Sequence, residues 1–277
     1  MNEAATRTLQ IQHALHEALG ADYFSLYFQP KFRGDNGVLA GAEALLRLRH
    51  PELGLLPPME FIPIAERSGQ IVQIGYWVVR ETCRQIRCWR ESGLPAIKVA
   101  INLSTRQLEQ SDLVANMLDI VRSEHVPCEQ IMFEITETVA MQDAPKTTNM
   151  IREFQQNGFE IAIDDFGTGY SSLAYLQRFR AKQLKIDRFF TNGLDEYGHE
   201  GNAIVSAIIK LAHTLEMDVV AEGVETDSQL AKLKGMMCDE MQGFLLGKPV
   251  TVEEFSALLH QQTSRKLLKF KPRKASA

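Results

Sequence analysis

Strand-like segments alternate with helix-like segments along almost the whole chain, and this alternation constrains the fold more than any other feature. The expected strands are short apolar runs near residues 23–30, 38–47, 98–103, 131–136, 160–165, 183–187, 219–222 and 241–245. Parallel strands joined by helices form either a closed barrel or an open doubly wound sheet. An open sheet would favour a glycine-rich nucleotide loop after an early strand, and this chain has none. We therefore expect a TIM-like (β/α)8 barrel of the α/β class.

The first two strands are expected to run antiparallel. The segments 23–30 and 38–47 are separated by a short link in which Asn36 and Gly37 form a tight-turn signal. So short a link cannot carry the crossover that a parallel pair requires. The barrel should therefore contain one antiparallel strand.

Helix-like periodicity fills the gaps between the strands. Residues 58–92 should form a long helical stretch that breaks near Gly69. Gly158 is placed to end a helix, and Ser171 and Thr226 with Asp227 are placed to begin others. The further helices are expected over 113–124, 145–156, 171–179, 203–215, 228–234 and 252–260.

Composition excludes several classes of protein. Hydrophobic residues make up 45% and charged residues 23% of the chain, as in ordinary globular domains. The net charge of −5 does not favour a nucleic acid polymer as partner. No apolar run approaches the length of a membrane span, and no apolar signal segment opens the chain. The four cysteines include no CxxC pair and fit a cytoplasmic location.

The two ends differ from the body of the chain. Residues 1–19 form an amphipathic segment with Leu9, Leu15 and Leu19 on one face, which is either a packing helix or a connector from an upstream domain. Residues 20–262 hold the main domain, and residues 263–277 form a basic tail. A solvated extension is the favoured interpretation of this tail, and contact with an anion or a membrane surface is the alternative.

Polar residues gather near the ends of the expected strands. In a TIM barrel the carboxyl ends of the strands form one mouth, where chemistry takes place. Any single carboxylate could instead cap a helix or pair with a surface lysine. Many ionised carboxylates in one place repel unless cations hold them, and an all-oxygen ligand set suits Mg²⁺ or Mn²⁺ rather than Zn²⁺. The residues are Glu43, Asn102, Glu134, Glu137, Asp164, Asp165, Lys185, Asp187, Glu222, Glu225 and Gln242.

The adjacent aspartates Asp164 and Asp165 are relevant to whether the site holds one metal ion or two. Neighbouring strand residues point to opposite faces, so both can reach one site only where the strand ends or bends. Gly167 and Gly169 follow and allow such a bend. Two ions about 3.5–4 Å apart are the usual apparatus of phosphodiester hydrolysis.

Two basic residues could act on a phosphate. Lys185 could orient the attacking water or neutralise a phosphate oxygen. Arg47 could clamp a phosphate with its planar guanidinium, or it could form a salt bridge with a neighbouring acid.

In this order the residues resemble the EAL-domain cyclic di-GMP phosphodiesterases, over roughly residues 20–260. The motif that names the family is present as Glu43-Ala44-Leu45, inside AEALLRLRHPELG and before FIPIAERSG. The other matching motifs are FQP at 28–30, NLS at 102–104, EITET at 134–138, DDFGTGYSSL at 164–173, KID at 185–187, AEGVET at 221–226 and QGF at 242–244.

The resemblance implies an EAL barrel that hydrolyses cyclic di-GMP to linear pGpG with two Mg²⁺ or Mn²⁺ ions. It assigns Lys185 to the attacking water, and Glu222 as a candidate general base, with Glu43 as a further catalytic residue. Glu137 would brace the loop that follows Asp165. The implied metal ligands are Glu43, Asn102, Glu134 and Asp164 for the first ion, and Asp164, Asp165 and Asp187 for the second, with Glu222 close by. The implied substrate contacts are Gln29, Leu45, Arg47, Glu225, Gln242, Gly243 and Phe244.

Three positions depart from the usual family pattern. They are Phe28, Leu48 and Arg180, where Tyr, Trp and Pro are frequent. None of them removes a metal ligand or the lysine, so they bear on loop packing and dimer geometry rather than on the chemistry.

Two alternatives to a hydrolase stay open. One is an EAL-like receptor that binds the nucleotide or a protein partner without cutting it, and the other is an unrelated Mg²⁺-dependent barrel enzyme of the enolase type. Degenerate family members usually lose the EAL glutamate, an aspartate of the DD pair or the loop glutamate, all of which this chain retains. We expect a homodimer in the cytoplasm, either as an independent enzyme or as the cytoplasmic part of a larger, membrane-anchored protein with an upstream sensor or cyclase domain.

Overall fold

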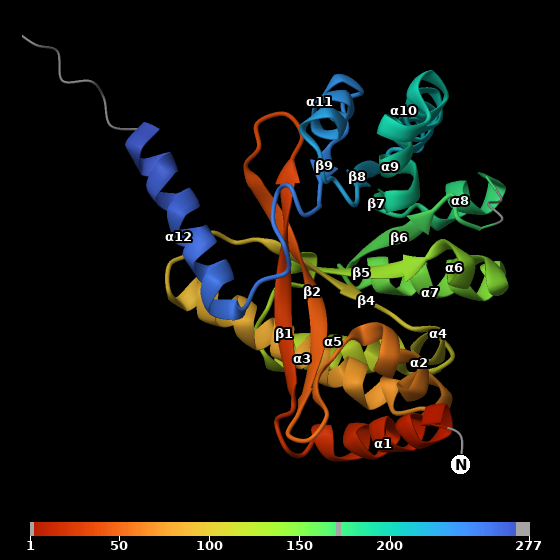
Figure 1. The fold of residues 1–277 in the computed structure, drawn as a ribbon, viewed down its shortest axis with the longest axis vertical. Coiled ribbons are helices and arrows are strands. Elements are labelled where there is room, and N and C mark those ends of the chain that lie inside the picture. Colours follow the sequence, from red (N-terminus) through yellow and green to blue (C-terminus); the bar gives the residue numbers. More distant parts are fainter. Residues whose placement is uncertain (1–2, 170–172, 270–277) are drawn as a thin grey trace, which may run out of the picture.

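The computed structural model describes residues 3–169 and 173–269, with side chains over 6–169 and 173–263. Within these ranges strands and helices alternate, as the sequence predicts (Figure 1). The strands are β1 (Phe24–Arg33), β2 (Leu39–His50), β3 (Gly54–Leu56), β4 (Lys98–Asn102), β5 (Ile131–Thr136), β6 (Glu160–Phe166), β7 (Gln183–Ile186), β8 (Asp218–Ala221) and β9 (Glu240–Met241). The helices are α1 (Glu3–Ala18), α2 (Pro58–Ser68), α3 (Ile71–Glu91), α4 (Thr105–Leu108), α5 (Leu113–Ser123), the 3-10 turn η1 (Cys128–Gln130), α6 (Glu137–Gln142), α7 (Ala144–Gln156), α8 (Leu173–Phe179), α9 (Arg188–Glu196), α10 (Gly198–Thr214), α11 (Asp227–Gly235) and α12 (Val252–Lys269).

The described strands close into a barrel of eight, and β3 is added to β2 as an edge strand. Around the barrel the order is β1, β2, β4, β5, β6, β7, β8 and β9, and β9 pairs again with β1. β1 runs antiparallel to both of its neighbours, whereas the pairs from β2–β4 to β8–β9 are parallel. The predicted barrel with one antiparallel strand is therefore confirmed.

A tight turn sets the register of the antiparallel pair. Gly37 takes the left-handed conformation with φ 65°, its N–H donates to Arg33 O, and Asn36 Oδ1 accepts from Val38 N. Glycine adopts this conformation without steric cost. The turn pairs β1 with β2 so that Gln29 lies opposite Glu43.

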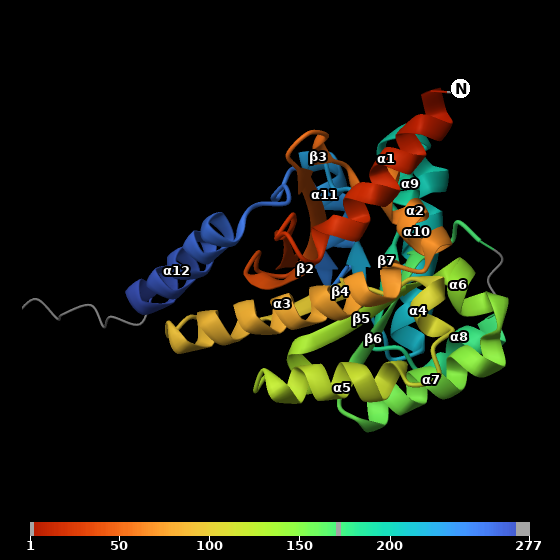
Figure 2. The ribbon, with the colours of Figure 1, turned by 90° about the horizontal axis from the view of Figure 1, so that it is seen from below.

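Successive side chains of each barrel strand point alternately outward, into the core beneath the helices, and inward, into the barrel. Outward-facing residues such as Ile101, Phe133 and Ile163 pack in the main core beneath the helices, and Figure 2 shows α3, α5 and α7 following one another around the outside. Inward-facing Ala100, Met132 and Ala162 form a separate small cluster. Two positions further along the same strands come Asn102, Glu134 and Asp164, which therefore point inward as well.

The N-terminal segment packs as a helix with Leu15 buried and Leu19 against the core, as predicted, but the placement of Leu9 on this face is wrong. In α1 the residues Ile11, Leu15 and Ala18 are buried, whereas Leu9 is 64% exposed. The buried positions follow the spacing i, i+4, i+7, so the apolar face is turned away from Leu9.

Other elements differ from the sequence predictions at their ends. The break near Gly69 is present between α2 and α3, but β9 has two residues where five were expected. α12 continues to Lys269, into the region assigned to the tail, and residues 270–277 and Ser171 lie outside the described residues. Among the described residues, no helix combines the length and apolarity that crossing a membrane requires.

The end of α11 gives a test of local backbone strain. Met237 follows this helix with φ 61° and is 75% exposed, and glycine is the residue that best accommodates this conformation. We expect Met237→Gly to raise the free energy of unfolding by about 0.5–1 kcal/mol, measured by urea denaturation. Gly93, which takes φ 71° after α3 with no atom near its missing Cβ, is the matched control. Gly93→Ala should lower the same quantity, and a destabilising Met237→Gly would contradict the expectation.

Candidate active site

The residues predicted to converge do so at the carboxyl ends of the barrel strands. They surround a cavity of about 320 Å³. Asn102, Glu134 and Glu137 are not among its lining residues. The lining residues are Gln29, Glu43, Leu45, Asp164, Asp165, Lys185, Asp187, Arg188, Glu222, Gly223, Glu225, Gln242, Gly243 and Phe244.

Lys185 is the centre of this group. Its side chain on β7 is 1% exposed, and its Nζ lies 2.6 Å from Glu134 Oε2, 2.7 Å from Glu222 Oε1, 3.0 Å from Asp164 Oδ2 and 3.7 Å from Glu43 Oε2. Burial alone would lower the pKa of Lys185, but the carboxylates outweigh it and raise the pKa well above the ordinary value. The raised pKa favours the charged form of this lysine under the cavity.

Glu134 is held between two lysines. Its fully buried carboxylate accepts from Lys31 Nζ through Oε1 at 2.7 Å and from Lys185 Nζ through Oε2 at 2.6 Å. Burial would raise the pKa of Glu134, but the two ammonium groups outweigh it and hold the pKa at about 2. Sequence reasoning missed Lys31, although it follows Gln29 by two residues and so shares its face of the strand.

A second set of contacts joins Glu43 to neighbouring amides. Glu43 accepts from Asn102 Nδ2 at 2.8 Å and from Gln242 Nε2 at 2.8 Å. Gln242 Nε2 also donates to Gln29 Oε1 at 2.9 Å, and Gln29 Nε2 donates to Gly247 O at 3.1 Å. Within the described part of the chain, the buried Gln242 Oε1 has no hydrogen-bond partner. It is an acceptor available to a ligand.

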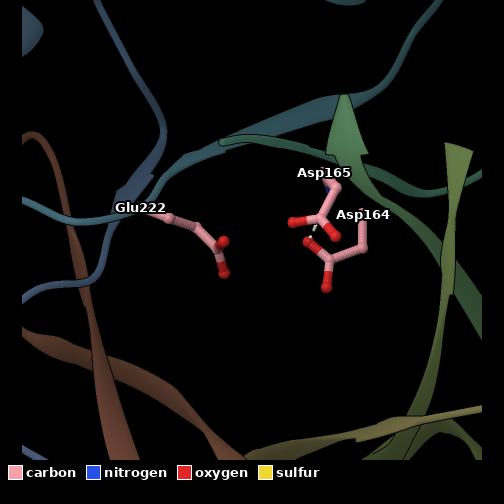
Figure 3. A group of neighbouring side chains, drawn as sticks. All are labelled: Asp164, Asp165 and Glu222. Atoms are coloured by element: carbon pink, nitrogen blue, oxygen red, sulfur yellow. Dashed lines mark hydrogen bonds between the residues drawn. The ribbon is translucent and has the colours of Figure 1, made fainter. Parts of the chain in front are cut away.

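Asp164, Asp165 and Glu222 form an acidic cluster. Each offers an oxygen that lies within 4.8 Å of the others, and Figure 3 shows Glu222 pointing toward the two aspartates from the far side. Asp165 takes φ 54°, and its N–H donates to Asp164 Oδ1 at 2.8 Å. The pairing of β6 with β7 is irregular at this place. The bend that brings both aspartates to one site is thus at Asp165 itself, before the glycines.

Burial and mutual repulsion raise the pKa values of this cluster. Burial raises the pKa of Asp164 to about 6 and that of Glu222 to about 8, with Lys185 acting in the opposite direction and the neighbouring carboxylates adding to the rise. Burial and the nearby Asp187 also raise the pKa of Asp165. A divalent cation would relieve the same repulsion.

The donor chemistry fits a hard cation. The available atoms are carboxylate oxygens and amide oxygens, which are the ligands preferred by Mg²⁺ and Mn²⁺. Asp187 is close enough to take part, because it lines the same cavity as Asp165 and its carboxylate raises the pKa of Asp165. Its Oδ1 also accepts from Phe189 N at 2.8 Å and caps α9.

Glu137 supports the loop that follows β6. It is fully buried, and its Oε2 accepts from Gly167 N at 2.8 Å. Gly167 has φ 95°, and a Cβ there would come within 2.5 Å of Phe190. Only glycine fits this close approach. The contact between Glu137 and the loop backbone therefore depends on Gly167.

Arg47 is not among the residues that line the cavity. Its Nη1 donates to Leu46 O at 2.9 Å, and its guanidinium stands 5.1 Å from the centre of the Tyr27 ring. The predicted phosphate clamp therefore stays a prediction. Arg188, which sequence reasoning missed, does line the cavity, and Gly223 makes room for it because a Cβ there would meet Arg188 at 2.4 Å.

Comparisons with known proteins identify the family of this chain. The EAL domain family model matches residues 12–249. The bifunctional diguanylate cyclase/cyclic di-GMP phosphodiesterase MucR of Pseudomonas aeruginosa is 44% identical over 93% of this chain and 37% of its own length. The cyclic di-GMP phosphodiesterase PdeR of Escherichia coli is 35% identical over 92% of this chain and 38% of its own length. The chain therefore spans well under half the length of these relatives.

A solved structure is similar over its whole length. The PaMucR phosphodiesterase in complex with c-di-GMP superposes with a TM-score of 0.85 and 43% identity, over 89% of this chain and 99% of that one. The fold, the ordered motifs and the matched family model agree, and the chain belongs to the EAL domain family.

Proposed function

We propose that this chain hydrolyses cyclic di-GMP to linear pGpG with two divalent cations, Mg²⁺ or Mn²⁺. The observation that carries the proposal is the buried Lys185 ammonium among four carboxylates at the floor of an open cavity. Relatives named as cyclic di-GMP phosphodiesterases support the substrate, as does the c-di-GMP complex of the PaMucR phosphodiesterase.

The cations would be held by the acidic residues of the mouth. When bound, they supply positive charge to a phosphate oxygen and lower the pKa of water. The all-oxygen donor set and the proximity of Asp164, Asp165 and Glu222 support this assignment. The proposed ligands are Glu43, Asn102, Glu134 and Asp164 for one ion, and Asp164, Asp165 and Asp187, with Glu222 nearby, for the other.

Hydrolysis adds one water across one of the two phosphodiester bonds. The water oxygen joins phosphorus, the P–O3′ bond breaks, and a proton passes to the leaving O3′. In this scheme Lys185 orients the water, and Glu222 accepts its proton. The residues proposed to bind substrate are Gln29, Leu45, Arg47, Glu225, Gln242, Gly243 and Phe244.

The proposal includes a homodimer and an upstream sensor or cyclase domain. Phe189 and Tyr197 on or beside α9 and Ile204 on α10 are 58%, 52% and 47% exposed, and exposed apolar side chains of this size favour an interface. The matched relatives are much longer than this chain, and MucR is named as a bifunctional cyclase and phosphodiesterase.

The direct test is incubation with cyclic di-GMP, with Mg²⁺ or Mn²⁺ and with chelator, followed by chromatography of the products. We expect pGpG in the metal-containing samples alone. Tight nucleotide binding without product would instead favour a receptor.

Glu43→Gln tests the assignment of the cation ligands. The change keeps the shape of the side chain and removes its charge, so we expect metal-dependent hydrolysis to fall about 100-fold. Glu109→Gln, which removes an exposed carboxylate paired with Arg106, is the control and should turn over like the parent. Near-parental activity of Glu43→Gln would refute the assignment of Glu43.

The raised pKa values of Asp164 and Glu222 predict a pH-dependent response to metal. A carboxyl group with a raised pKa in the folded state favours folding below about pH 4, and this contribution is lost as the pH rises through about 6 and 8. Cations compete with the same protons. The increase in Tm that Mn²⁺ produces should therefore grow between pH 5.5 and 8.5, and a pH-independent increase would contradict this.

Glu137 is expected to act through the loop after β6. Glu137→Ala removes the acceptor of Gly167 N, so hydrolysis should fall about 10- to 100-fold while nucleotide binding is partly kept. Glu137→Gln retains a carbonyl acceptor, so its hydrolysis should fall less than that of Glu137→Ala. Titration calorimetry and product assays on both variants test the role, which is wrong if Glu137→Ala binds and turns over like the parent.

A further inference from the structure

Lys31 is a buried lysine that the proposed mechanism does not use. It lies on β1, two residues after Gln29, and its side chain points into the barrel. It is 3% exposed, and its Nζ lies 2.7 Å from Glu134 Oε1. Lysines are almost never buried to this depth unless they are paired. The contact with Glu134 therefore accounts for its position.

Glu134 links Lys31 to Lys185. One of its oxygens accepts from Lys31 and the other accepts from Lys185. A carboxylate is planar, so fixing one oxygen fixes the direction in which the other points. Glu134 is fully buried, which leaves it little freedom to turn.

Three oxygens lie within 3.0 Å of Lys185 Nζ. Those of Glu134 and Asp164 accept hydrogen bonds from the ammonium group, and that of Glu222 forms an ion pair with it. Asp164 and Glu222 line the cavity, whereas Glu134 does not. A substrate that enters the cavity competes for the first two. Glu134 can keep both lysine contacts, because each carboxylate oxygen has a further lone pair for the cation proposed above.

We propose that Lys31 is a positioning residue of this site, which holds Glu134 so that Glu134 in turn holds Lys185 beneath the cavity. The inference rests on the proposed function, because it assigns Lys31 a part in the same hydrolysis. It differs from a merely structural ion pair, since a structural pair would affect folding and not the turnover of the folded protein.

Loss of the Lys31 ammonium has two consequences. Glu134 Oε1 loses its partner, so the carboxylate and Lys185 shift, and a displacement of about 1 Å near reacting atoms can cost 100-fold in rate. The buried group also becomes more negative by one charge, which strengthens the attraction for a divalent cation.

Lys98 offers a matched control. It lines the same second cavity as Lys31, of about 190 Å³, but it pairs with Glu160 rather than with Glu134. Lys98→Met thus removes a lysine from the same cavity without touching the contact with Glu134.

The experiment compares Lys31→Met, Lys31→Gln and Lys98→Met with the parent chain. The kcat and KM for cyclic di-GMP are measured at saturating Mn²⁺, and the apparent Kd for Mn²⁺ alone is measured from the shift in Tm. For Lys31→Met we expect kcat about 10- to 100-fold lower, KM within about threefold of the parent and Mn²⁺ bound about tenfold more tightly. Lys31→Gln keeps one donor to Glu134, so its kcat should lie between those of the parent and Lys31→Met. Lys98→Met should match the parent in kcat, KM and the apparent Kd for Mn²⁺.

Parental kcat and parental Mn²⁺ affinity in folded Lys31→Met would overturn the inference, as would equal effects in Lys98→Met. If Lys31→Met does not fold, the comparison is made with Lys31→Gln, where parental values for both quantities have the same meaning. A parent chain without hydrolytic activity would refute the proposed function and the part of Lys31 in turnover, but not the positioning of Glu134 by Lys31. The Mn²⁺ titration would then decide: tighter binding in Lys31→Met and not in Lys98→Met supports the positioning of Glu134, and equal binding in the two variants overturns it.

Discussion

The buried ammonium of Lys185 is the interaction on which the rest of the site depends. A lysine that is 1% exposed would be strongly destabilising without counter-charges, and the carboxylates around it could not stay ionised together without a cation. Lys185 comes from β7, whereas Glu43, Glu134 and Asp164 come from β2, β5 and β6. In an open sheet with the same neighbours β2 and β7 would lie far apart. The contact therefore requires the closed barrel, and fold and site depend on each other.

At Asp165 the backbone departs from the extended conformation of β6, and this departure shapes the site. Alternation along β6 would send Asp164 and Asp165 to opposite faces. The left-handed backbone at Asp165 brings them together, at a cost of about 1–3 kcal/mol for a residue other than glycine. The N–H of Asp165 is satisfied by Asp164 Oδ1, and Glu137 holds the backbone of Gly167 just beyond. The backbone strain is thus at Asp165, and hydrogen bonds hold the backbone at Asp165 and at Gly167.

The sequence predicted the parts of the fold that local patterns control. The turn at Gly37, the break near Gly69 and the antiparallel first pair followed from glycine positions and link length. Helix α9 was missed because Asp187 alone separates it from β7, so no loop signal marks its start. The acidic residues were found by their places at strand ends. The spacing of Lys31 from Gln29 marks its face of the strand, but its pairing with Glu134 on β5 is a contact between strands that no local pattern records. The position of Arg47 likewise depends on Tyr27 of β1.

Charge balance links cation affinity, pH response and stability in this site. Among the described residues, the ammonium groups of Lys31 and Lys185 form ion pairs with four carboxylates, those of Glu43, Glu134, Asp164 and Glu222. Burial, together with repulsion among the carboxylates, raises the pKa values of Asp164 and Glu222 to about 6 and 8. A divalent cation would relieve the same repulsion because it meets the same excess of negative charge. Any substitution that changes this excess should therefore alter cation affinity and the pH dependence of stability together.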